Sequence, residues 1–137
     1  MILQDIPAVV AHAFATPGVE NMVHDFSKPQ PIAGAKFYYI RHVLHNQADH
    51  KAQEVLRLTK AAMGPDSVLL VDEMILPEMG VNIETASIDL TMMAACAAKE
   101  RTLQDWRGLI EGAGLRLAKT YVYNVCSYES VMDIRLP

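Results

Sequence analysis

The stretch FYYIRHVLHNQADHKAQEVLRLTKAAMGPDSVLLVDEMILPE, residues 37–78, decides the fold of this chain. It begins with Phe37–His42, an aromatic and β-branched run typical of a strand. It later contains Val68–Val71, a continuously apolar run typical of a parallel strand covered on both faces. Between the two runs, apolar residues recur at helical spacing and Gly64-Pro65 follows, which predicts a β-α-β unit.

The two strands of this unit predict a pocket at their carboxyl ends. A right-handed crossover makes the strands parallel, and ligands of such sheets bind beyond the carboxyl ends. His45 leaves the first strand and Glu73 leaves the second, so we expect a base and a carboxylate to face one pocket. Histidine titrates near about 6.5, which suits a base at cellular pH. For Glu73, a solvated loop carboxylate is the alternative, and Asp72 is a rival candidate.

The flanking segments predict a single α/β domain over residues 1–137. The mostly parallel sheet should have helices on both faces and an antiparallel C-terminal hairpin, because the last two strands alternate in a one-sided manner. Gly112 and Gly114 follow a helical pattern, as in a helix C-cap. The other expected elements are short strands at 1–3 and 19–23, helices at 83–94 and 103–110, and hairpin strands at 115–123 and 130–136.

Composition excludes several classes of protein. Hydrophobic residues make up 51% and charged residues 20%, as in globular domains, and the net charge of -4 offers no basic surface for nucleic acid. Cys96 and Cys126 have no metal-type spacing, so we expect reduced thiols and no metal site. The chain has neither an apolar run of about 20 residues nor the basic start of a signal peptide. We therefore expect a soluble, cytoplasmic protein.

Several motifs, in order and spacing, resemble the catalytic half of S-adenosylmethionine-dependent O-methyltransferases. The similar group includes plant caffeic acid O-methyltransferases and fungal polyketide tailoring enzymes. The resemblance covers nearly the whole chain from Gln4 on and implies a truncated Rossmann-like methyltransferase sheet. The motifs that carry it are QDIPAVV, GVENMVHDF, YYIRHVLHNQADH, VLLVDEMILPE, DLTMMAACAAKERTLQDW and GLIEGAGL.

The resemblance implies a catalytic role for three residues. His45 in LHNQAD occupies the position of the family's histidine, which removes the proton from the substrate hydroxyl. Glu73 in VDEMILPE and Glu100 in AKERT fall on the positions of the two glutamates that flank that histidine. Glu73 is expected to orient His45, and Glu100 to assist as acid or second orienter. A surface ion-pair cluster with its neighbouring cations is the alternative for Glu100.

The resemblance also implies cofactor contacts, which we expect to be vestigial. Asp5 and Asp25 correspond to the family's acids near the ribose and the adenine, and Arg41 to a basic contact before the histidine. Turn and cap roles are the alternative for both acids. The family's glycine-rich loop, its strand and the N-terminal dimerisation helices have no counterpart in these 137 residues. The expectation is therefore that S-adenosylmethionine binding is lost and that no cofactor is used.

The expected substrate pocket combines one departure from the family with flexible apolar residues. Asn46 and Gln47 replace the usual Asp and Trp, which alters the pocket wall beside His45. Methionines suit a pliable apolar pocket, although core filling is their usual role. With Asn46, the residues expected to line the pocket are Met74, Met92 and Met93.

These observations lead to two functional hypotheses. The first is an S-adenosylmethionine-independent acid-base enzyme that acts on a small polyketide-like or aromatic metabolite by cyclisation or lactonisation, dehydration or enolisation. The second is half of a split O-methyltransferase, or a pseudoenzyme subunit, completed by a partner chain. A missing central strand leaves unpaired edges, so we also expect a homodimer or a partner methyltransferase chain.

Overall fold

The computed structural model describes all residues, 1–137, and its strands form two separate sheets. The small sheet pairs β1 (Ile2–Asp5) with β2 (Glu20–Val23) in parallel. The large sheet has the order β3 (Phe37–Arg41), β4 (Val68–Leu76), β7 (Glu129–Arg135), β6 (Arg116–Asn124), and β5 (Arg101–Thr102) pairs with the end of β4. The helices are α1 (Pro7–Val10), the 3-10 turn η1 (Leu44–Asn46), α2 (Asp49–Ala62), α3 (Ile83–Cys96) and α4 (Leu103–Gly112).

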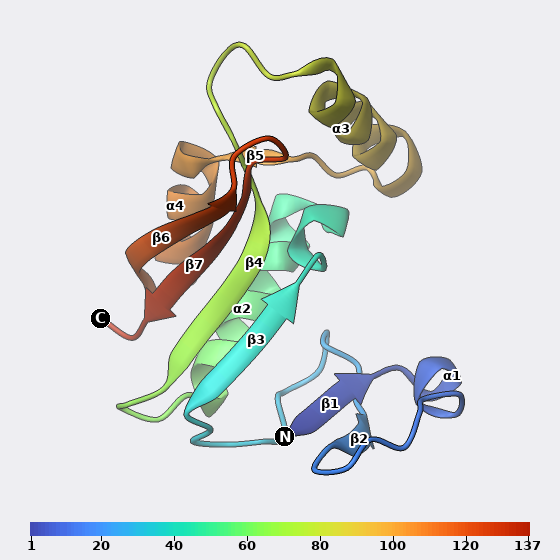
Figure 1. The fold of residues 1–137 in the computed structure, drawn as a ribbon. Helices are drawn as coiled ribbons and strands as arrows, with labels where there is room; N and C mark the ends of the chain where they lie inside the picture. The colour runs from blue at the N-terminus through green and yellow to red at the C-terminus, as the bar shows by residue number, and fades with distance from the viewer.

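The β-α-β unit forms as the sequence predicts. β3 and β4 are parallel, and α2 connects them, with Ala52, Val55 and Leu56 buried at helical spacing. Figure 1 shows α2 and α4 on the same side of the large sheet, where their apolar faces cover β4 and β7. Trp106 of α4 is fully buried, and its indole Nε1 donates to the carbonyl of Met74 at 3.1 Å. These contacts form the main core.

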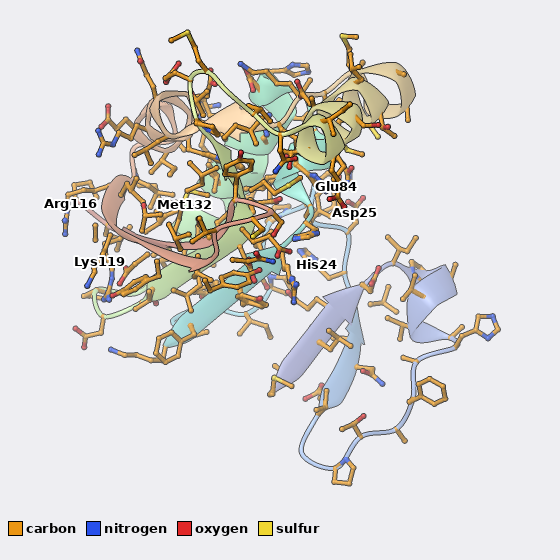
Figure 2. All side chains as sticks on the ribbon, turned by 45° about the horizontal axis from the view of Figure 1, so that its top comes forward. His24, Asp25, Glu84, Arg116, Lys119 and Met132 are labelled. Carbon is orange, nitrogen blue, oxygen red and sulfur yellow. The ribbon has the colours of Figure 1, made fainter.

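The C-terminal hairpin and the fold class are also confirmed. β6 and β7 pair antiparallel, and β7 pairs antiparallel with β4. Figure 2 shows Arg116 and Lys119 on the side of the large sheet remote from the small sheet, and Met132 in the interior. The helix α4 ends at Gly112, and Gly114 follows with a φ of 74°, which is the left-handed conformation of a C-cap glycine.

One expected strand boundary is wrong. The sequence suggested that Glu73 follows its strand, whereas β4 continues to Leu76 and Glu73 lies within it. The extension arises because β7 pairs with β4 from Leu69 to Met74, and β5 pairs with its last residues. Glu73 therefore projects from a rigid strand towards the core instead of from a loop.

The two sheets do not join within this chain. Figure 1 shows β1 on the far side of β3 from β4, pointing in a similar direction, and no backbone pairing connects β1 with β3. Two aromatic residues of β3, Phe37 and Tyr39, are 61% and 57% exposed. No helix has both the length and the apolar character that a membrane crossing needs.

Candidate active site

The structure brings His45 and Glu100 into direct contact. His45 lies in η1, directly after β3, and Glu100 directly precedes β5. Nδ1 of His45 is 2.7 Å from Oε1 of Glu100, and the two side chains are 12% and 0% exposed. The backbone N–H of Glu100 donates to Oδ1 of Asp89 on α3 at 2.7 Å, which fixes the segment that carries the carboxylate. The alternative of a surface cluster for Glu100 is thereby excluded.

Glu73 contacts the backbone that precedes His45. Its Oε1 accepts hydrogen bonds from the N–H groups of Val43 at 3.0 Å and Leu44 at 2.9 Å. The direct contact with the imidazole therefore comes from Glu100, which the sequence reasoning expected to be an acid or second orienter after Glu73. Glu73 instead fixes the start of η1. The second carboxylate oxygen of each glutamate, Oε2, is buried and has no hydrogen-bond partner.

The electrostatics of the site favour a charged imidazole. The hydrogen bond to Glu100 raises the pKa of His45, and the negative charges of Glu73 and Glu100 raise it further against the effect of burial. Burial raises the pKa of Glu73, because the surroundings solvate its carboxylate poorly. His42 is also close, with its ring centroid 5.5 Å from that of His45. Its side chain is 41% exposed, and its Nε2 is 3.7 Å from Oε1 of Glu129.

The three predicted cofactor residues lie at carboxyl ends of strands. Asp5 ends β1, and its Oδ1 accepts from the N–H of Ile6 at 2.8 Å. Asp25 follows β2, where Figure 2 shows it in the segment leading back to the large sheet. Its Oδ1 accepts from the N–H of Ser27 at 2.8 Å, and hydrogen bonding to Ser27 lowers the pKa of Asp25. Arg41 ends β3 and is 53% exposed. Its Nε is 3.6 Å from Oδ2 of Asp72.

The expected pocket residues lie in two different places, three of them in η1 and α3 and one in the core of β4. Asn46 lies in η1, which contacts α3, and its Oδ1 is 3.9 Å from Sγ of Cys96. Met92 is half-buried on α3, and Met93 on the same helix is 60% exposed. Met74 is a core residue of β4 that is 7% exposed. A hollow of about 660 Å³ lies between α2 and α4, and His45 does not line it.

Sequence reasoning missed Arg101 and considered Asp72 only as a rival to Glu73. Arg101 follows Glu100 in a run of charged residues, yet its side chain is completely buried and donates to the carbonyls of Leu44 and Gln47 on either side of His45. Asp72 is 3% exposed and accepts from the hydroxyls of Tyr39 at 2.5 Å and Tyr123 at 2.9 Å. Most of these partners are more than 30 positions away, and several are backbone carbonyls, so no local sequence signal could identify them.

Comparisons with known proteins identify the family. The model of the O-methyltransferase domain matches residues 1–116. The chain is 46% identical over 132 residues to the O-methyltransferase ucdC of Aspergillus ustus, covering 96% of this chain and 35% of that protein. It is 44% identical over 124 residues to the demethylsterigmatocystin 6-O-methyltransferase stcP of Emericella nidulans, covering 90% of this chain and 61% of that protein.

Two solved structures match almost the whole chain. One is LepI in complex with SAM, with a TM-score of 0.94, 36% identity and coverage of 99% of this chain and 36% of that one. The other is described as a pericyclic reaction enzyme, with a TM-score of 0.95, 37% identity and the same coverage. The chain thus spans about a third of the length of ucdC and of these structures.

These findings correct the expectation that no cofactor is involved. The expectation rested on the absence of a glycine-rich loop from these 137 residues. A matched structure holds SAM, and curated relatives are O-methyltransferases, so the similarity points to S-adenosylmethionine as the cofactor. Because the family model matches residues 1–116 of 137, this chain belongs to the O-methyltransferase domain family.

Proposed function

We propose that this chain forms the acid-base part of an S-adenosylmethionine-dependent O-methyltransferase that acts on a small aromatic or polyketide-like metabolite. The observation that carries the proposal is the 2.7 Å contact between Nδ1 of His45 and the buried Oε1 of Glu100. The demethylsterigmatocystin 6-O-methyltransferase among its relatives supports a hydroxyl as the acceptor group.

His45 is the general base in this proposal. Donation from Nδ1 to Glu100 fixes the tautomer and leaves the lone pair on Nε2 free to accept a proton from the substrate hydroxyl. Glu100 then stabilises the imidazolium that forms, and Glu73 contributes a second negative charge. Removing the proton as the oxygen reacts contributes about 100- to 10,000-fold to such rates.

The residues at the strand ends fit the cofactor. Oδ1 of Asp5 accepts from the adjacent N–H, while its Oδ2 has no protein partner and can accept from a ribose hydroxyl. Asp25 is exposed and ionised, and Arg41 is half exposed. Together they offer acceptors and one cation beyond the carboxyl ends of parallel strands, where such ligands bind. When bound, S-adenosylmethionine supplies the methyl group.

The proposed substrate wall lies beside His45. Asn46 belongs to the same turn, and α3, which contacts this turn, carries Met92 and Met93. An exposed methionine surface adapts to flat aromatic ligands. Met74 is only 7% exposed within β4, so it belongs to the core and not to this wall.

We propose that a further polypeptide completes the site, either a second copy of this chain or a partner methyltransferase chain. The separate sheets leave β3 with an unpaired edge. The helix α3 is apolar on most sides, yet only Thr85 in it is buried, and helices of this character are normally covered. A split methyltransferase half has these properties, as does a pseudoenzyme subunit without activity of its own.

A cyclisation at the same site is a second candidate. The pericyclic reaction enzyme among the structural neighbours favours it, because it matches 99% of this chain. A fixed imidazole can protonate or deprotonate a polyketide-like substrate without any change of geometry at His45. The two candidates differ in their products, since only the first adds a methyl group.

The test measures cofactor binding and product formation together. Calorimetry with S-adenosylmethionine is performed on the chain alone and with a polypeptide that supplies the unmatched region of a relative. Phenolic acceptors are then incubated with methyl-labelled cofactor and with wild type or His45→Gln. A labelled product that wild type forms and His45→Gln does not form supports O-methylation. An unlabelled isomer that wild type forms and His45→Gln does not form supports cyclisation. Equal product from both proteins would remove His45 from either role.

A further inference from the structure

Arg101 is a completely buried cation near the site. Its side chain is 0% exposed, and its guanidinium makes four hydrogen bonds to the segment 44–49. Nη1 donates to the carbonyl of Leu44 at 2.9 Å, and Nη2 donates to the carbonyl of Gln47 at 2.7 Å. Nε and Nη2 both donate to Oδ1 of Asp49, at 2.9 and 2.8 Å. The guanidinium carbon lies 5.1 Å from the ring centroid of Trp106.

The carbonyls that Arg101 holds lie on both sides of His45. Leu44 precedes His45 in η1, and Gln47 caps the end of this turn. At the opposite end, Glu73 accepts from the first backbone N–H groups of the same segment. A carboxylate thus holds the donors of the turn, and a guanidinium holds its acceptors.

The chemistry of this contact requires arginine. A buried cation is tolerated only when its donors are paired, so the loop cannot move away from Arg101 without leaving a bare charge in the core. The planar guanidinium reaches three acceptors in fixed directions, whereas the ammonium of lysine is a compact point charge. The side chain of Asp49 is 60% exposed, so the charge of the pair is only partly removed from water.

We propose that Arg101 is a positioning residue that holds His45 in register with Glu100, an inference that rests on the proposed role of His45 as the base. Glu100 and Arg101 are consecutive, so one dipeptide fixes both the imidazole ring and the backbone that carries it. Arg101 itself has no exposed atoms with which to contact substrate or cofactor.

The test compares Arg101→Lys with wild type, and Arg57→Lys serves as the matched control. Arg57 on α2 also donates to a backbone carbonyl, that of Gly112, but lies on the surface. NMR titration of the His45 ring reports its contact with Glu100 without any need for activity. In Arg101→Lys, we expect the pKa of His45 to return towards its ordinary value, and the control to leave it unchanged.

Kinetics give a second readout on the complete enzyme. We expect kcat of Arg101→Lys to fall by about 100-fold, the loss typical of a misplaced catalytic group, with KM for S-adenosylmethionine unchanged. If Arg101→Lys does not fold, Asp49→Asn replaces it, since this change removes the exposed counter-charge and should shift the pKa of His45 in the same direction.

The outcomes separate this inference from the proposed function. A destabilised Arg101→Lys protein with an unchanged pKa of His45 and unchanged kcat would show that Arg101 only supports the fold. Absence of methyl transfer from wild type would overturn the proposed function, while the NMR comparison would still decide whether Arg101 positions His45.

Discussion

His45 and Glu100 are 55 positions apart, yet Nδ1 of the imidazole lies 2.7 Å from Oε1 of the carboxylate. The contact exists because His45 lies in η1 directly after β3, and Glu100 directly precedes β5, which pairs with the end of β4. The end of β3 and the start of β5, which both pair with β4, thus bring an imidazole and a carboxylate together.

Replacing His45 tests the base directly. In the completed enzyme, His45→Gln should lower the rate of methyl transfer by about 100- to 10,000-fold, because no other group accepts the substrate proton. Circular dichroism should show an unchanged fold, since the side chain makes one main contact. His50→Gln, on the exposed side of α2, is the control and should retain the rate. Comparable losses in both variants would contradict the role of His45.

The pH dependence of the reaction should reveal the contact with Glu100. Only the neutral imidazole accepts a proton, so the rate rises with pH through the raised pKa of His45. Glu100→Gln removes the largest cause of that raised pKa, and the acidic limb of kcat should therefore move to lower pH. Pre-steady-state rates across the pH range measure this shift. A limb that stays at the wild-type position would show that Glu100 does not control the ionisation of His45.

The same raised pKa predicts how stability depends on pH. A group with a higher pKa in the folded state stabilises the fold most at pH values below its unfolded pKa, about 6.5 for histidine. This contribution is lost as the pH rises through the raised pKa of folded His45. Urea unfolding should show a loss of stability over this range that is smaller in His45→Gln. Identical pH profiles for both proteins would argue against the ion pair.

Glu73 should contribute to the stability of the fold as well as to the charge near His45. Glu73→Ala leaves two backbone N–H groups, those of Val43 and Leu44, without an acceptor. We expect the free energy of unfolding to fall by about 1–3 kcal/mol. Glu73→Gln keeps the accepting oxygen and removes a buried charge, so its loss should be smaller. Urea denaturation measures both, and equal losses would show that the backbone contacts contribute little.

Asp72 organises a polar cluster that a spectroscopic titration can test. Burial and the hydrogen bond to Asp72 raise the pKa of Tyr123 to about 12. Asp72→Asn removes the negative charge but keeps an oxygen acceptor, so the pKa of Tyr123 should fall towards 10.0. Ultraviolet absorbance at alkaline pH records the change, with Asp133→Asn as a control elsewhere on the sheet. An unaltered titration of Tyr123 in Asp72→Asn would contradict the assignment.

The β-α-β unit and the hairpin could be predicted because each depends on local patterns. Val68–Val71 is apolar on both faces, and Ala52, Val55 and Leu56 repeat at helical spacing. The family followed from motifs around His45 and is confirmed by the match over residues 1–116. The expected loss of the cofactor was wrong, because a matched structure holds SAM and the curated relatives are O-methyltransferases. The catalytic roles of His45, Glu73 and Glu100 stay predictions.

The sequence by itself determined which residues form strands and helices and which side chains could carry acid-base chemistry, because periodicity and motif identity are properties of neighbouring positions. Only the tertiary structure decided that Glu100, and not Glu73, contacts the imidazole of His45, and that Arg101 is buried beneath its loop. These relationships depend on the pairing of β4 with β5 and β7. Pairing between strands far apart in sequence sets the direction of each side chain, and no local pattern specifies it.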